Sequence, residues 1–403
     1  ESGIGRLKYF KEMLMKIGYF CNTTNWKKKP YTQILDEARD IAVYCDKNGW
    51  DSIWFTEHHL NHEGMESCAN PLMMGTDIAA RTNKIRIGQA CNVITFWNPI
   101  RLAEDIAILD NLSNGRVEVG VGRGIYGREA LHLNIEADLK DQSKNKRLFE
   151  ETLTIMRKAW TEKFFSHQGE FYTYPAPDFI WQHDMSPPNE DFMDLKTNKL
   201  KKISVVPQPY QKPHPDIWIP SQGSTETIMW AAHPSRKYTY YQTLALAKVI
   251  DKYLGMYKSV AKEYGYEASP NQLGWSVPVY VSDTNENAIN EARPHIEAFI
   301  NKFLKMPVER LLPAGYTSIA SLKGLINARK ATTLGGYQTI ETLMKNQMFI
   351  CGSPDQVTKF FKKRSKELGI GHLSATMHFG TLPHELTMRS IELFGKQVLP
   401  HIV

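Results

Sequence analysis

The side chains best suited to chemistry in this sequence are Glu57, His58 and His59, which directly follow the apolar run 53–55, Ile-Trp-Phe. β-branched and aromatic residues are typical of a buried strand, whereas a carboxylate and two imidazoles are costly to bury without partners or a task. A neutral imidazole near pH 7 can accept and donate protons. If the run is a barrel strand, the polar group lies at its carboxyl end, where barrel enzymes carry their chemistry.

A second candidate group is the glycine-rich segment 115–124, which predicts a strand with Arg123 at its exit. Glycine lets another group approach the backbone, and a guanidinium can bind an anion. The dinucleotide fingerprint is Gly-x-Gly-x-x-Gly opening a helix, and this segment does not match it. A tight strand end with a surface arginine is the alternative interpretation.

The third group is the turn 219–227, in which small and hydroxyl residues lead from a predicted strand into a predicted helix. Free backbone N–H groups and hydroxyls at a helix start form an anion cradle. Ser224 can equally be an N-cap that binds nothing but its own helix. The sequence leaves both interpretations open.

Short apolar runs alternate with longer amphipathic stretches along the chain, and this rhythm indicates repeated β-α units. Repeating the unit about eight times closes a parallel barrel. We therefore expect a (β/α)8 TIM barrel with insertions after strand 4 and strand 7, and a doubly wound open sheet is the main competitor. The predicted strands are 17–21, 52–55, 85–90, 117–121, 217–219, 239–241, 275–281 and 373–378.

The domain prediction is one barrel domain over 15–403, preceded by a non-native or processed extension at 1–14. Residues 175–220 hold nine of the 21 prolines, which forbids a regular helix there. We therefore expect an excursion at about 165–210, in which 171–174 pair with 203–206 in a hairpin over the barrel mouth. A second insertion at about 306–347 is a lid candidate.

Bulk composition excludes several classes. The chain has 403 residues, is 42% hydrophobic and carries a net charge of +6. No apolar run approaches the length of a membrane span, and the lysine runs lack the interleaved aromatics of a nucleic-acid surface, so neither a membrane nor a nucleic acid is an expected partner. The five cysteines are scattered without a zinc spacing, which fits a reducing cytoplasm.

The order of these motifs resembles the flavin-dependent, luciferase-like monooxygenase family, which includes bacterial luciferase. The likeness runs from about Lys16 to Ile402. It is carried by short motifs at 54–59, 70–71, 98–101, 120–124, 206–209, 213–215, 218–232, 351–357 and 379–385.

The resemblance implies reduced flavin mononucleotide (FMN) at the mouth of a (β/α)8 barrel. The positions that match the family's phosphate contacts are Arg123, Arg147, Ser224 and Thr227. The strand 89–95 is expected to line the isoalloxazine ring, and Asn92, Gly122 and Gly223 complete the expected cofactor-binding set. Gly122 stands where luciferase has a reactive-looking cysteine, so we expect that no thiol is available there in this protein.

The family's active-site histidine matches His58, which we expect to donate or accept a proton. Its alternative is a structural histidine that bonds Glu57. Glu57 is expected to hold the strand end and the imidazole, and His59 to pack or to bond a neighbour. Aromatic candidates for the mouth are Trp97, Tyr126, Phe179, Trp181 and Phe379.

The implied reaction uses O2 and reduced FMN, delivered by a separate flavin reductase, to oxygenate a small hydrophobic organic substrate. Relatives usually form homodimers. Three alternatives stay open. The first is a metal site formed by the Glu-His-His group with His62, Glu63 and Glu66; the second is hydride transfer with a deazaflavin or flavin, without oxygen insertion; the third is a non-catalytic flavin-binding relative.

Overall fold

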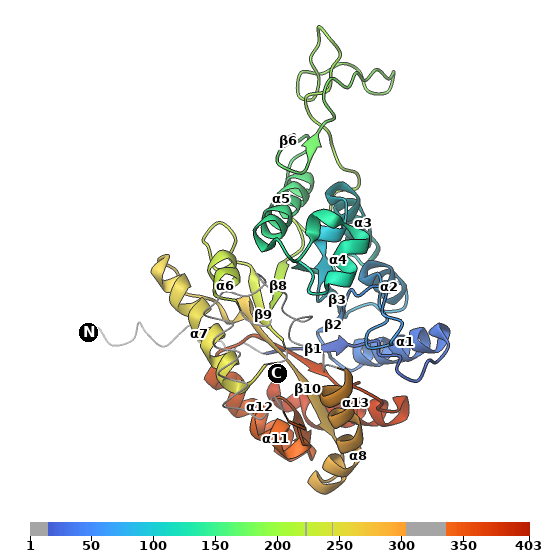
Figure 1. Ribbon diagram of the computed structural model, residues 1–403, viewed down its shortest axis with the longest axis vertical. Coiled ribbons are helices and arrows are strands. Elements are labelled where there is room, and N and C mark those ends of the chain that lie inside the picture. Colours follow the sequence, from blue (N-terminus) through green and yellow to red (C-terminus); the bar gives the residue numbers. More distant parts are fainter. Residues whose placement is uncertain (1–14, 222–223, 244, 304–335) are drawn as a thin grey trace, which may run out of the picture.

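The centre of the molecule is a closed barrel of eight parallel strands (Figure 1). The computed structural model describes residues 15–221, 224–243, 245–303 and 336–403. In order around the barrel the strands are β1 (Lys16–Cys21), β2 (Ser52–Phe55), β3 (Arg86–Gln89), β5 (Val117–Gly122), β8 (Ile217–Ser221), β9 (Thr239–Gln242), β10 (Leu273–Val281) and β12 (His372–Thr376). Because β12 pairs with both β10 and β1, the sheet closes. The predicted barrel is confirmed, and the open sheet is excluded.

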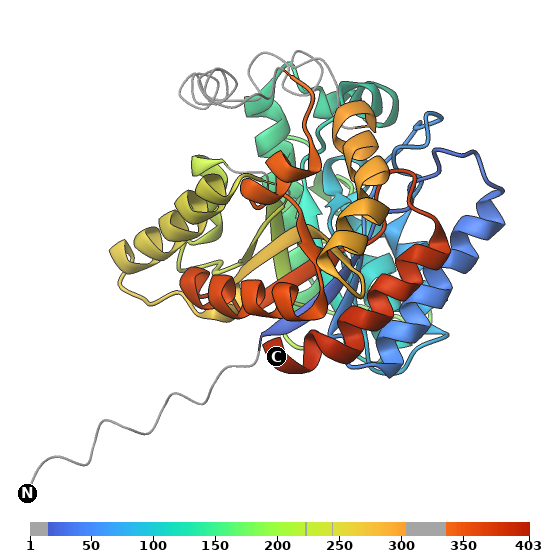
Figure 2. The same ribbon diagram turned by 90° about the horizontal axis from the view of Figure 1, so that it is seen from below.

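Helices surround the barrel on its outside, as Figure 2 shows. They include α1 (Tyr31–Lys47), α2 (Pro71–Ala79), α3 (Pro99–Leu112), α5 (Gln142–Thr161), α6 (Thr225–Ala231), α7 (Ala247–Glu263), α8 (Asn285–Ala298), α12 (Pro354–Leu368), α13 (His384–Gln397) and α14 (Leu399–Ile402). α2 and α3 begin at Asn-Pro pairs, in which the asparagine caps the helix and proline occupies its first turn. α12 begins in the same way at Ser353, a start signal that the sequence interpretation did not use.

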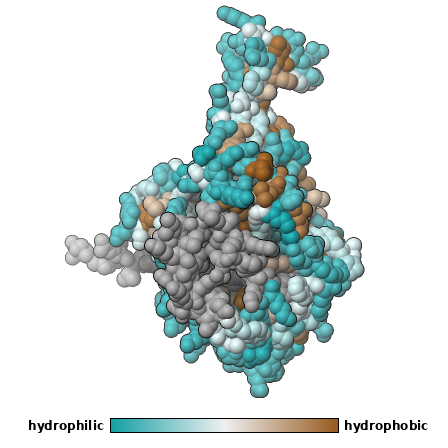
Figure 3. Space-filling view, in the orientation of Figure 1, coloured by the Kyte–Doolittle hydropathy of each residue, from teal (hydrophilic) through white to brown (hydrophobic). Residues whose placement is uncertain are grey.

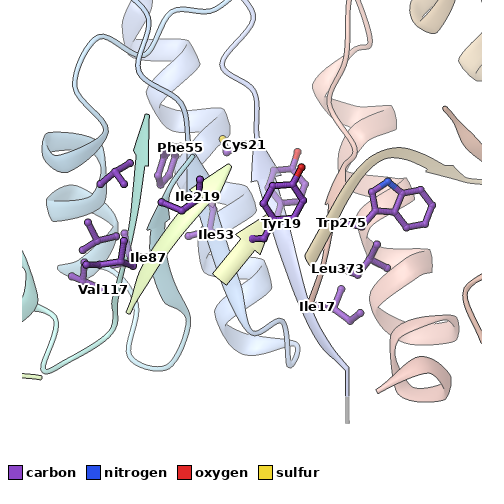
Figure 4. Packing of buried hydrophobic residues seen from close by; sticks show 14 of the residues in the cluster. Ile17, Tyr19, Cys21, Ile53, Phe55, Ile87, Val117, Ile219, Trp275 and Leu373 are labelled. Atoms are coloured by element: carbon purple, nitrogen blue, oxygen red, sulfur yellow. The ribbon is translucent and has the colours of Figure 1, made fainter. Parts of the chain in front are cut away.

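Alternate residues of each strand pack in two directions. Figure 4 shows Ile17 and Tyr19 of β1 with Ile53 and Phe55 of β2 in the large cluster that joins the strands to the surrounding helices. The other residues fill the barrel interior, where Trp54, Trp218 and Tyr241 form a separate buried cluster. A Cβ on Gly88 would lie 2.2 Å from the Trp54 ring, so glycine in β3 makes room for tryptophan in β2.

Between β5 and β8 the chain forms α4 (Gly127–Leu133), the short helix η2 (Ile135–Ala137), α5 and a projecting arm, residues 165–205. The predicted hairpin in this excursion is wrong. β7 (Thr173–Tyr174) pairs with β6 (His167–Gln168), and Ile203 instead bridges to Phe165. In Figure 1 the arm extends away from the barrel.

Between β10 and β12 lie α8, η4 (Phe299–Phe303), α11 (Ile340–Lys345), β11 (Ile350–Gly352) and α12. β11 pairs in parallel with the end of β10. Most of the lid candidate at 306–347, and the extension at 1–14, lie outside the described residues, so both stay predictions. Within the described ranges no helix is both long and apolar enough to cross a membrane.

Candidate active site

Glu57 follows β2 and is almost fully buried. Its carboxylate accepts hydrogen bonds from the backbone N–H of Val93 (2.7 Å) and the indole N–H of Trp97 (2.9 Å), and it lies 2.9 Å from Nε2 of His59. A buried carboxylate is tolerated where several donors satisfy it. Glu57 therefore ties the end of β2 to β4 (Asn92–Val93), and the imidazole that it holds belongs to His59 rather than to His58.

His58 lies between two other carboxylates. Its Nε2 is 2.5 Å from Oε2 of Glu66, and its Nδ1 is 3.3 Å from Oε1 of Glu129. Only 13% of its side chain is exposed, and its ring packs against Tyr126 with 5.1 Å between centroids. Burial lowers the pKa of His58, but the two carboxylates outweigh it and raise that pKa from 6.5 to about 10.

Sequence reasoning missed Glu129 and considered Glu66 only as a metal ligand. Glu129 sits in the first turn of α4, is 1% exposed, and accepts the backbone N–H of His59 at 2.7 Å. No hydrophobic pattern marks it, because α4 has only seven residues. Arg128, its neighbour, pairs with Glu63 at 2.9 Å and so holds the loop that carries Glu66 against α4.

The glycines of β5 first serve packing within the protein. A Cβ on Gly120 would lie 1.7 Å from the carbonyl oxygen of Gln89, and one on Gly122 would lie 2.2 Å from Sγ of Cys91. The segment between β3 and β4 thus rests directly on β5. The Cys91 thiol occupies the space beside Gly122, and burial raises the pKa of that thiol well above its ordinary value.

The same segment carries buried polar atoms that lack protein partners. Asn92 is fully buried, and its amide donates to Gln89 (3.1 Å) and to the carbonyl of Gly120 (3.2 Å). Its Oδ1, and Nε2 of the buried Gln89, have no hydrogen-bond partner among the described residues. Such orphaned groups are costly without a ligand, and here they form one acceptor and one donor.

Arg123 follows β5 at the same end of the barrel. Its carbonyl oxygen accepts hydrogen bonds from Thr95 (3.1 Å) and from Asn145 of α5 (3.3 Å). Arg123 is half-buried, and its guanidinium forms no ion pair or side-chain hydrogen bond within the described part of the chain. Arg147, two residues beyond Asn145, is half exposed and pairs with Glu170 at 2.7 Å.

Ser224 and Thr227 follow β8, which pairs with β5, so they and Arg123 come from neighbouring strand ends. Ser224 is the N-cap of α6, and its hydroxyl accepts the backbone N–H of Thr227 at 3.4 Å and donates to Glu226 at 3.0 Å. The prediction that Ser224 is an N-cap is therefore confirmed. Gly223 lies outside the described residues.

The aromatic candidates separate into two groups. Trp97 bonds Glu57, Tyr126 packs on His58, and Phe379 is fully buried against Phe349. The remaining two, Phe179 and Trp181, lie on the arm, 47% and 41% exposed and stacked on each other. The structure does not place these two at the barrel mouth.

The metal alternative has no ligand set among the described residues. In the described ranges, no three His, Cys, Asp or Glu side chains are arranged to hold a metal ion. The His62 side chain is 86% exposed, and Glu63 is engaged by Arg128. A cavity of about 230 Å³ lies elsewhere, between the loops that follow β1 and β12, and Thr24, Lys27 and His378 are among its lining residues.

A closed barrel whose strand ends carry buried carboxylates, imidazoles and an arginine without an ion pair among the described residues defines an α/β-barrel protein with a site at the carboxyl ends of its strands. The model of the luciferase-like monooxygenases matches residues 15–372, so this chain belongs to that family. The family consists of flavin-dependent oxidoreductases, most of which are monooxygenases.

Individual relatives are distant. The oxygenase component of the flavin-dependent trigonelline monooxygenase of Acinetobacter baylyi is 29% identical over 187 residues, which is 46% of this chain and 43% of that protein. The chain therefore spans less than half the length of this relative. The oxygenating constituent of 3,6-diketocamphane monooxygenase from Pseudomonas putida, solved in complex with FMN, has a TM-score of 0.74 at 22% identity and covers 96% of this chain and 99% of its own. An F420-dependent secondary alcohol dehydrogenase has a TM-score of 0.63 at 16% identity, over 97% of this chain and 100% of its own.

Proposed function

We propose that this chain is the oxygenase of a two-component flavin-dependent monooxygenase, which uses reduced FMN and O2 to insert one oxygen atom into a small hydrophobic organic substrate. Family membership and the site geometry support this proposal. The observation that carries it is the pair of orphaned polar atoms on Gln89 and Asn92, together with Arg123 at the end of the neighbouring strand β5, whose guanidinium has no ion pair among the described residues. A phosphate-bearing ligand whose ring edge offers both a donor and an acceptor satisfies all three groups at once.

The residues divide the work as follows. Arg123 holds the phosphate, with Arg147, Ser224, Thr227 and Gly223 as further contacts. For Arg147 this requires exchange from its exposed pair with Glu170, which costs little because solvent screens exposed ion pairs.

On the ring side, Asn92 and Gln89 bind the polar ring edge beside Gly122, and Glu57 fixes Trp97 and His59 around it. His58 handles the proton at the reacting centre. Reduced flavin, when bound, supplies the electrons with which one atom of O2 reaches the substrate and the other becomes water. The chain's own part is to orient the ring and exclude bulk water.

Partners follow from the same proposal. A separate flavin reductase delivers reduced FMN, and the relative from Acinetobacter, itself called an oxygenase component, supports a two-protein arrangement. The oxygenase acts as a homodimer, as we expect from the resemblance. Its five cysteines are all free, which fits a reducing cytoplasm.

The proposal is tested by supplying the protein with reduced FMN from a flavin reductase, 18O2 and a panel of apolar substrates. We expect one labelled oxygen atom in the product of the wild type. Arg123→Ala should weaken binding of reduced FMN roughly 10- to 100-fold, since a desolvated phosphate loses a charge-assisted hydrogen bond of about 1.5–3 kcal/mol. Anaerobic calorimetry measures that dissociation constant.

Arg101→Ala is the matched control, because Arg101 is a surface arginine of α3 with a side chain 69% exposed. Its dissociation constant should equal that of the wild type. If Arg123→Ala binds reduced FMN as tightly as the wild type, the phosphate sits elsewhere. Substrate oxidation with a deazaflavin and without O2 uptake would establish the hydride-transfer alternative. We retain this alternative because the F420-dependent dehydrogenase has a similar fold.

A further inference from the structure

Both ring nitrogens of His58 face carboxylate oxygens. Nε2 is 2.5 Å from Glu66, and Nδ1 is 3.3 Å from Glu129. An ionised carboxylate only accepts hydrogen bonds, and a neutral imidazole carries a single N–H. A neutral ring therefore leaves one nitrogen lone pair against a carboxylate, whereas a doubly protonated ring satisfies both contacts. The geometry favours the imidazolium.

The two carboxylates differ in how firmly they are held. Glu129 is 1% exposed, and its Oε1 also receives the His59 backbone N–H at 2.7 Å, so the backbone of the β2 end fixes it. The Glu66 side chain is 16% exposed and belongs to the loop between β2 and α2. One carboxylate is thus a fixed inner partner of His58, and the other covers the ring nitrogen on the outer side.

We propose that Glu129 is a positioning residue that holds His58 as an imidazolium, and that Glu66 occupies its Nε2 until a reactant replaces it. The protonation state of His58 does not depend on the proposed function; only the reaction in which His58 takes part does. His58 then gives a proton or a charged hydrogen bond rather than acting as a base. The group that displaces Glu66 must be a hydrogen-bond acceptor, and an anionic oxygen fits best.

Charges around the ring agree with this. The described titratable groups near it come from four places. Glu57 and His59 belong to the β2 end, Tyr126, Arg128 and Glu129 to the α4 region, Glu63, Glu66 and Cys68 to the loop, and Cys91 lies beside β4. Apart from the histidines, the cation in this group is Arg128, which forms an ion pair with Glu63. Because the folded-state pKa of His58 is raised from 6.5 to about 10, its stabilising effect is complete below pH 6.5 and is lost as the pH rises through 10.

The test is 15N NMR of histidine-labelled, ligand-free protein, with the His58 signals assigned from their loss in His58→Gln. We expect two protonated ring nitrogens at pH 7.5 and a titration midpoint well above pH 7. Glu129→Gln and Glu66→Gln should each lower that midpoint by about 1–3 pH units, because each removes an anion beside the ring. Glu150→Gln is the control, since Glu150 pairs with Lys146 on α5 rather than with His58, and the midpoint should not move.

A wild-type spectrum with a single protonated ring nitrogen at pH 7.5 would overturn the proposal, whatever the variants do. In turnover, Glu129→Gln should move the alkaline limb of the pH profile for product formed per O2 consumed to lower pH, a shift that simple loosening of the fold does not produce. The two proposals fail separately. If His58 is an imidazolium but the protein binds no flavin, the roles of Glu129 and Glu66 are supported and only the proposed function is contradicted. If His58 is neutral but the protein binds reduced FMN, only the roles of Glu129 and Glu66 are contradicted.

Discussion

Adjacent histidines at the end of β2 have different partners. His58 contacts Glu66 and Glu129, whereas His59 bonds Glu57 and packs edge-on against Phe96. Successive side chains of an extended segment point in opposite directions, so neighbours in sequence reach different surroundings. We therefore expect the chemical role to belong to His58, whereas His59 completes the hydrogen bonding of a buried carboxylate.

This division predicts different results for His58→Gln and His59→Gln. His58→Gln should keep flavin affinity and oxidation but release peroxide instead of product, because the proton-transfer group is gone. His59→Gln should retain product formation while losing about 1–3 kcal/mol of unfolding free energy, since it disturbs a hydrogen bond to buried Glu57. Product formed per O2 consumed and chemical denaturation measure the two effects. Equal coupling losses in both variants would contradict the assignment.

At the scale of the elements, two glycines of β5 allow the β3–β4 segment to pack against that strand. Gly122 faces the Cys91 side chain, whereas Gly120 faces the backbone carbonyl of Gln89. Gly122→Ala pushes a Cβ onto the Cys91 side chain and should cost about 1–3 kcal/mol of unfolding free energy. Cys91→Ala in the same chain removes the clashing sulfur and should restore most of that loss. Thermal and chemical unfolding of the single and double variants measure the rescue.

Gly120→Ala serves as the control for this pair, because its Cβ would meet the backbone carbonyl of Gln89. Cys91→Ala should therefore not rescue it. A double variant Cys91→Ala/Gly122→Ala as unstable as Gly122→Ala alone would show that the thiol does not determine the fit. Equal rescue of Gly120→Ala would lead to the same conclusion.

The barrel strands could be predicted from the sequence because each is a short apolar run followed by polar or turn residues, as in 52–59. The predicted pairing of 171–174 with 203–206 failed, since 173–174 finds a partner at 167–168 across a short turn, and closing a short loop costs less entropy. In the candidate site, Glu57 and His58 could be predicted because they are polar residues that follow a strand. Glu129 could not be predicted, because its contacts depend on where a seven-residue helix places it.

At the scale of the whole molecule, the arm is the part least bound to the barrel. Residues 176–185 are all exposed, and the arm projects along the long axis of the molecule (Figure 1). The arm carries exposed apolar side chains, among them Met185 at 86%. Figure 3 shows a brown area at the top of the molecule, where the arm lies. At its base, by contrast, Phe165 is fully buried and bridges to Ile203.

The contrast predicts how substitutions in the arm affect the rest of the molecule. Phe179→Ala with Trp181→Ala should change unfolding free energy by no more than about 0.5 kcal/mol and leave the dissociation constant for reduced FMN unchanged, because both side chains are exposed and belong to the arm, which extends away from the barrel. Phe165→Ala should cost about 3–5 kcal/mol, because it leaves a cavity where the arm joins the core. Denaturation and anaerobic flavin titration compare the two. If the double variant bound flavin more weakly while its fold stayed intact, the arm would have to reach the strand ends during binding. That result would support the sequence-based prediction that Phe179 and Trp181 line the barrel mouth.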